Sequence, residues 1–173
     1  MRMRAMLFAL LLVVVGAVPA SANHGQSGNE VPIHGAIGGM DERDFDAPDC
    51  PGTGWLWRWH TDGTGTVSHL GRVDFQLTHC TAPPSLNHGE LVLTAANGDV
   101  LEMAYQGVIT EVSETYATWE FEWSVAGGTG RFDGATGSGV GHALSLIDLN
   151  PERGTTISLE GEIAYDASSR SNR

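Results

Sequence analysis

The sequence predicts an all-β protein, a closed antiparallel β-barrel of about eight strands, with a β-sandwich as the alternative. Three observations predict it. Apolar and polar residues alternate through most of the chain after residue 54, turn-forming residues separate the alternating runs, and no segment keeps a helical period. A period of two with one polar face is what an antiparallel sheet requires. Regularly spaced strands of this kind close into a barrel or pack as a sandwich.

The alternation is clearest where Trp119, Phe121 and Trp123 share one face of an extended segment and Glu120 and Glu122 share the other. Eight or nine strands result, according to whether neighbouring runs merge across a bend. The predicted strands are 31–40, 54–60, 64–70, 72–79, 90–96, 100–110, 115–125, 139–148 and 155–165. Turns are expected at 62–65 and 97–99, where Asp-Gly and Asn-Gly pairs favour tight hairpins, and longer loops at 83–89 and 150–154.

The N-terminus predicts a secretory signal peptide over residues 1–22. Arg2 and Arg4 precede an uncharged apolar run, and Ala20-Ser21-Ala22 supplies the small residues of a cleavage site. The apolar run is shorter than the ~20 residues of a membrane-spanning helix, which disfavours an anchor. With cleavage after Ala22, we expect a secreted protein. Its parts are a flexible N-terminus over 23–30, a single barrel domain over 31–165 and a C-terminal tail over 166–173.

The composition bears on partners. The chain carries 9 Lys plus Arg against 21 Asp plus Glu, for a formal net charge of −12. Such a surface repels phosphate backbones and anionic lipids, so neither nucleic acid nor, after signal cleavage, a membrane is an expected partner. A homo-oligomer remains open.

The two cysteines, Cys50 and Cys80, are expected to form a disulfide, because an exported chain with an even number usually pairs them. A metal-binding pair is the alternative, but the two lack close spacing.

A glycine-rich stretch follows the aromatic strand. Gly127, Gly128 and Gly130 permit a reversal of the chain with positive φ. Phe132 is expected to fold back onto the core as a plug, and Arg131 to cap free carbonyls. Gly134 and Gly137 allow a second bend. Neither a following helix nor a Lys-Ser/Thr pair is present, so the stretch does not indicate a phosphate-binding loop.

This stretch, 127–132 with 134–137, resembles the glycine motif of the allene oxide cyclase and dirigent barrel superfamily. The likeness is greatest to uncharacterised exported bacterial members, and 65–71 and 96–99 also resemble those sequences. The resemblance covers about 63–145 and implies an eight-stranded, calycin-like antiparallel barrel, often oligomeric in the plant members. In those members the cavity either cyclises an unstable fatty-acid epoxide or steers the coupling of phenoxy radicals.

The candidate cavity residues are aromatic rings and two histidines that share a face with apolar neighbours: His69, Tyr105, His142, Trp57, Trp119 and Trp123. His69 follows Val67 in phase, and His142 lies in phase with Val140 and Leu144, which predicts both inside the barrel. Each is then a core histidine bonded to a neighbour, a group that orients a ligand or transfers a proton, or a metal ligand. No H-x-H or H-x-x-x-H spacing occurs, so no metal site and no cofactor is expected.

No catalytic set is assigned. The acid-rich segment 41–49 is expected to be a solvated loop, with weak calcium binding as the alternative. Three functions follow from these features. The first is a barrel that binds a small hydrophobic or aromatic ligand, or serves as a stable scaffold. The second is a cyclase or coupling guide using His69, Tyr105 or His142, and the third is an extracellular interaction module. The sequence favours a protein that is not an enzyme.

Overall fold

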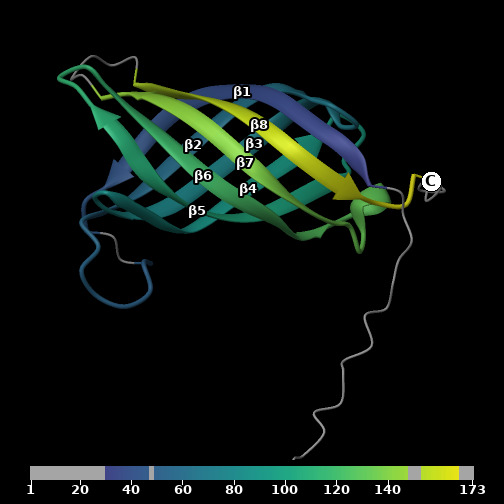
Figure 1. The fold of residues 1–173 in the computed structure, drawn as a ribbon, viewed down its shortest axis with the longest axis horizontal. Helices are drawn as coiled ribbons and strands as arrows, with labels where there is room; N and C mark the ends of the chain where they lie inside the picture. The colour runs from purple at the N-terminus through teal and green to yellow at the C-terminus, as the bar shows by residue number, and fades with distance from the viewer. Residues whose placement is uncertain (1–29, 47–48, 148–152, 168–173) are drawn as a thin grey trace, which may run out of the picture.

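The computed structural model describes residues 30–46, 49–147 and 153–167, and its strands close into an antiparallel barrel (Figure 1). Each strand pairs with the next, and the last pairs with the first. The elements are β1 (Val31–Asp44), β2 (Trp57–Val67), β3 (Gly71–Ala82), β4 (Ser85–Ala95), β5 (Val100–Val112), β6 (Tyr116–Gly128), the short 3₁₀ helix η1 (Gly130–Phe132), β7 (Thr136–Leu146) and β8 (Gly154–Ala164). The predicted barrel is confirmed, and the sandwich alternative is wrong.

The predicted turn at 62–65 is wrong, because these residues lie in the middle of β2, paired with β1 on one side and β3 on the other. The two strands expected there are one. Gly63 and Gly65 mark a close approach of strands, since a Cβ at either would meet a backbone oxygen of β1. Other strands are also longer than expected: β1 runs on to Asp44, β3 to Ala82, β5 to Val112 and β6 to Gly128. The longer loop expected at 83–89 is wrong, because β4 begins at Ser85.

One end of the barrel is closed. The β2–β3 and β4–β5 turns and η1 lie there (Figure 1). The Phe132 ring is completely buried and packs 5.0 Å from the ring of Tyr165, so this side chain plugs the end. Gly130 has φ 63°, a conformation that suits glycine, at the start of η1. Arg131 is expected from the sequence to cap free carbonyls. Its Nε instead lies 3.2 Å from the Asp99 carboxylate.

The middle of the barrel is filled with side chains. Fully buried aliphatic residues of β3, β4 and β5 pack against the rings of β6. Space for those rings comes from glycines on the neighbouring strands: a Cβ at Gly139 or Gly161 would collide with the Trp123 ring, and one at Gly141 with Phe121. The large rings of β6 therefore pack closely only because the residues beside them on neighbouring strands are glycines.

At the other end of the barrel β1, β3, β5 and β7 end and the strands that follow them begin (Figure 1). A cavity opens at this end, which is called the open mouth. The disulfide between Cys50 and Cys80, with an S–S distance of 2.03 Å, confirms the predicted pairing and ties the β1–β2 connection to the end of β3. No helix among the described residues is long and apolar enough to cross a membrane. The predicted signal peptide over 1–22 lies outside the described residues.

Candidate functional site: a cavity at the open mouth

A cavity of about 380 Å³ opens at the mouth of the barrel. Its volume falls in the range of small-molecule sites, and its walls are largely apolar and aromatic. Side chains from seven of the eight strands or their ends line it: Arg43, Trp57, Trp59, His79, Thr81, Pro83, Leu86, Ile109, Val112, Ala117, Trp119, Ser145 and Ile147.

The register of β1, β2 and β3 arranges their cavity-lining side chains in layers. At the rim, Trp57 of β2 stands opposite Thr81 of β3. One layer deeper, Trp59 stands opposite His79 across the same pair and opposite Arg43 of β1. His79 and Thr81 are both buried because they continue the alternation of Val73, Phe75 and Leu77 along β3. The register of β3 with β4 shifts beside them, between Thr78 and Cys80, where β4 carries one extra residue.

His79 lies at the centre of an aromatic cluster. Its ring stacks on Trp59 with 6.1 Å between centroids and meets Trp119 edge-on at 5.4 Å. Its Nδ1 is hydrogen-bonded to the Tyr105 hydroxyl at 2.7 Å. Burial lowers the pKa of His79 to about 3, so the imidazole is neutral at physiological pH. Burial also raises the pKa of Tyr105, which keeps the phenol protonated.

Below the cavity, two tryptophan indoles are anchored to Asp41 through hydroxyl groups. On one side, Trp59 Nε1 donates to Thr61 Oγ1 at 3.2 Å, and Thr61 donates to Asp41 Oδ1 at 2.8 Å. On the other, Trp119 Nε1 donates to Ser145 Oγ at 3.0 Å; Ser145 and Thr155 Oγ1 are 2.6 Å apart, and Thr155 donates to Asp41 Oδ2 at 2.8 Å. Each hydroxyl has one hydrogen, so Ser145 donates to Thr155.

Asp41 therefore holds the walls of the cavity in place. Burial raises the pKa of its carboxyl, while the two threonine hydroxyls and Trp59 act in the opposite direction. The expectation of a solvated acidic loop from residue 41 onward is wrong for this residue, because β1 continues through it. No group of three or more His, Cys, Asp or Glu able to hold a metal ion occurs within 30–46, 49–147 and 153–167.

Three polar atoms of the cavity wall are buried without a hydrogen-bond partner among the described residues: Arg43 Nε, Trp57 Nε1 and Thr81 Oγ1. Buried polar groups are bonded in the great majority of cases, so three such atoms around one cavity need an explanation. All three can donate a hydrogen, and Arg43 and Trp57 can only donate. Residues that line the cavity thus carry hydrogen-bond donors that no described residue satisfies.

The structure brings together three of the six candidate cavity residues. Trp57 and Trp119 line the cavity, and Tyr105 lies behind it, bonded to His79. Trp123 is buried in the filled core farther along β6, with its indole nitrogen donating to the Val140 carbonyl at 3.0 Å.

The two candidate histidines lie outside the barrel, so the prediction that they point inward is wrong. His69 occupies the β2–β3 turn with φ 66°, and its Nε2 is 2.9 Å from the Pro32 carbonyl oxygen. His142 faces solvent on β7, 3.5 Å from Glu120, with 54% of its side chain exposed. On β7 the interior positions are taken by glycine and alanine, because the β6 rings need the space.

Sequence reasoning missed His79, Thr81 and Arg43. The first two carried a usable signal, since they continue the alternation of Val73 and Leu77, which are buried on the same face of β3. Arg43 carried none, because it lies in a run of acidic residues that resembles a surface loop.

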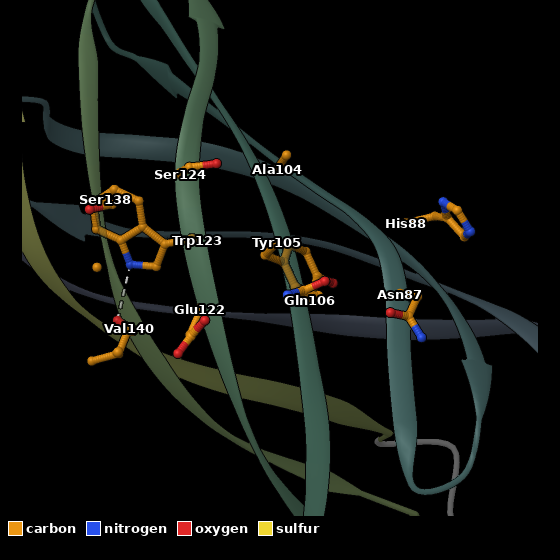
Figure 2. Close-up of a pocket in the computed structure, with 11 residues that line it drawn as sticks. Asn87, His88, Ala104, Tyr105, Gln106, Glu122, Trp123, Ser124, Ser138 and Val140 are labelled. Atoms are coloured by element: carbon orange, nitrogen blue, oxygen red, sulfur yellow. Dashed lines mark hydrogen bonds between the residues drawn. The ribbon is translucent and has the colours of Figure 1, made fainter. Parts of the chain in front are cut away.

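A second hollow, of about 690 Å³, lies on the outer face across β4, β5, β6 and β7 (Figure 2). Figure 2 shows its polar side chains, among them Asn87, Gln106 and Glu122, spread over neighbouring strands, with Trp123 at one side. It is larger than the mouth cavity but open, and none of the buried unpartnered atoms among the described residues lies in it. The mouth cavity is therefore the better candidate for a site.

Fold and cavity together define the class: a small antiparallel β-barrel with one plugged end and one open aromatic mouth. No model of a known protein family matches the chain, and no curated protein matches it in sequence. Among solved structures it resembles the pterocarpan synthase dirigent protein GePTS1, with a TM-score of 0.51 and 16% sequence identity over 87% of this chain and 92% of that chain. At this identity the likeness concerns the fold, which is a dirigent-like eight-stranded barrel.

Proposed function

We propose that the protein binds a small apolar or aromatic molecule in the mouth cavity of its barrel. The observation that carries this proposal is the contrast between a filled core and an open end ringed by Trp57, Trp59 and Trp119. Large, rigid rings supply contact area at low entropic cost, and a few polar groups fix orientation, which is the usual composition of a small-molecule site.

The electrostatics of the site support binding over catalysis. His79 and Tyr105 are both neutral at physiological pH and bonded to each other. Neither is poised near neutrality, where a general acid or base works best. The Asp41 carboxylate already accepts from Thr61 and Thr155 and does not line the cavity. The barrel is thus equipped to hold a molecule rather than to move its protons.

A second candidate is a dirigent-type guide, which would orient a reactive molecule without supplying catalytic groups. The structural likeness to a dirigent protein favours it, and an aromatic cavity suits it. The two functions separate by product analysis. A guide changes the stereochemical ratio of products when phenoxy radicals couple in its presence, whereas a binder leaves that ratio as it is in buffer.

Export from the cell is part of the proposal. The predicted leader over 1–22 and the Cys50–Cys80 disulfide both support it, because disulfides persist in oxidising compartments. Detection of the chain outside the cell, beginning at Asn23, would test this part independently of any ligand.

The test of binding compares substitutions at two alanines, one that lines the mouth cavity and one that lines the outer hollow. Ala117→Leu places extra methyl groups in the mouth cavity, and Ala104→Leu places the same groups in the outer hollow. Titration calorimetry with 2-naphthylmethanol and 2-naphthamide measures affinity. We expect Ala117→Leu to weaken binding about tenfold or more, the scale of a lost methylene-sized space in an apolar pocket, and Ala104→Leu to leave it unchanged.

Indole N–H signals in a ¹H–¹⁵N spectrum locate the bound probe. A ligand in the mouth should shift the signals of Trp57, Trp59 and Trp119, which line that cavity. A ligand in the outer hollow should instead shift Trp123, which lines that one. Shifts confined to Trp123, or an effect of Ala104→Leu alone, would contradict the proposal, as would a failure of both these probes and of 2-naphthoate to bind.

A further inference from the structure

The mouth cavity has two chemically different walls. The wall formed by β1, β2 and β3 carries the three unpartnered donors, Arg43 Nε, Trp57 Nε1 and Thr81 Oγ1. The wall formed by β4, β5 and β6 is aliphatic at its inner positions, with Leu86, Ile109 and Ala117. A ligand that satisfies both walls carries an oxygen acceptor on one side and an apolar ring or chain on the other.

The donor wall also carries positive charge. Arg43 is half-buried with its guanidinium 5.1 Å from the centroid of the Trp59 ring. Burial and then the nearby Arg153 lower the pKa of Arg43, and Asp41 offsets them only in part. Arg43 forms no ion pair with any described residue. Arg58, at the same end of the barrel, pairs with Asp49 at 3.2 Å. A second carboxylate beside Arg43 would supply a counter-charge that the described residues do not provide.

We infer that the natural ligand is a carboxylate anion with an aromatic or other planar apolar body, its carboxylate held by Arg43, Trp57 and Thr81. This inference rests on the proposed binding function and names the chemical class of its ligand. A carboxylate has two oxygens and about four lone-pair sites, enough for three donors at once. The Thr81 residue is 1% exposed, so its hydroxyl makes no stable hydrogen bond to bulk solvent.

The layering of the strands fixes the orientation. Trp57 and Thr81 face each other at the rim, while Asp41 lies opposite Thr61, two layers deeper. The carboxylate is therefore held between the rim and the layer of Arg43, above the like charge of Asp41, and the apolar body points inward toward Trp119 and the aliphatic wall. The reverse orientation would bring two carboxylates together in a buried site, which is strongly unfavourable.

Three probes of nearly equal shape test the inference: 2-naphthoate, 2-naphthamide and 2-naphthylmethanol, measured by titration calorimetry at neutral pH. We expect naphthoate to bind about tenfold or more tightly than either neutral probe, the scale of one charge-assisted hydrogen bond. Arg43→Gln should reduce naphthoate affinity to that of the amide and change amide affinity little. Thr81→Val should weaken naphthoate binding by a smaller factor.

Arg58→Gln is the matched control, since it removes an arginine at the same end that does not line the cavity. It should leave the preference for naphthoate intact, and the melting temperatures of all variants verify folding. If the three probes bind with equal affinity, or if Arg43→Gln keeps the preference, the carboxylate inference is overturned while the binding function stands. If none of the three binds, the binding function fails and the inference fails with it.

Discussion

The two ends of this barrel are built from similar residues and reach opposite outcomes. At the closed end an aromatic side chain fills the opening, and the buried charge of Asp99 meets Arg131. At the open mouth more aromatic side chains are present, yet they surround a cavity of about 380 Å³. Of the four buried side-chain atoms that lack a hydrogen bond among the described residues, three belong to this cavity lining, and the fourth is Arg131 Nε at the closed end. The difference lies in where the rings attach. Phe132 arrives from a loop that folds across the opening, whereas Trp57, Trp59 and Trp119 stand on strands.

Strand-borne rings line the wall of a barrel, and a loop-borne ring can cross its axis. A plug therefore needs a connection that turns back sharply, which is what the glycines around η1 provide. The connections at the open mouth include no plug of this kind among the described residues. We take this asymmetry as the physical basis for placing stability at one end and ligand binding at the other.

Removing the plug tests that division with the largest expected effect. Phe132→Ala should lower the free energy of unfolding by about 3–5 kcal/mol, because a fully buried ring leaves a cavity that the closed end cannot fill. The matched change at the mouth is Leu86→Ala, whose side chain already borders open space. Its cost should lie near the lower limit for such truncations, about 2 kcal/mol. Urea unfolding measures both.

Equal losses for the two variants would show that the ends are equally packed and would break the comparison. A larger loss at Leu86 would reverse it. Ligand affinity sharpens the contrast, since Phe132→Ala should leave the affinity for naphthyl probes unchanged while the cavity at the mouth stays intact.

The same two regions show how far the sequence alone leads. The alternation of Trp119, Phe121 and Trp123 with glutamates correctly predicts which face of β6 is buried. The same rule fails on β7, where Val140 and Leu144 are in phase with each other but point outward. The interior there belongs to glycines, because the rings of β6 occupy the volume that side chains of β7 would need.

The mouth is less predictable than the core for a related reason. Asp41 and Arg43 look like part of an exposed acidic loop, and only the register of β1 with β2 places them beside Thr61 and Trp59. Polar residues that face inward have no signature in the hydrophobic pattern, so a site made of them appears only when the barrel closes. His79 and Thr81 are the exceptions, since their positions follow the phase of β3.

The pH dependence of the free energy of unfolding tests the open mouth, because His79 lies in its aromatic cluster. The unfolded chain takes up a proton on this side chain near pH 6.5, whereas the folded protein does so only near pH 3. Stability is therefore complete above about pH 6.5 and falls by about 1.4 kcal/mol per pH unit from this group as pH drops toward 3. His79→Gln, which keeps an acceptor for Tyr105, should remove this share of the slope.

His142→Gln is the control, because it removes a histidine from the outer surface and leaves the buried pair unchanged. Denaturant unfolding at several pH values gives the slopes of all three proteins. A wild-type slope that is unaffected by His79→Gln would mean that the imidazole is not held neutral, and the aromatic cluster at the mouth would then have to admit water.

Two buried threonines give the smallest and most specific test. Thr61 and Thr81 are 0% and 1% exposed, but Thr61 accepts from Trp59 and donates to Asp41, whereas the Thr81 hydroxyl has no partner among the described residues. Thr61→Val should destabilise the protein by about 1–3 kcal/mol, since it strands two buried groups. Thr81→Val should be neutral or stabilise the ligand-free protein by up to about 1 kcal/mol, because it removes an unsatisfied polar atom without changing the shape of the side chain.

The same Thr81 variant is expected to bind naphthoate less tightly, so stability and affinity move in opposite directions at one position, as expected where a residue is kept for function rather than for folding. If Thr81→Val destabilised the free protein as much as Thr61→Val, its hydroxyl would be serving the fold, and the donor wall would lose one of its three members.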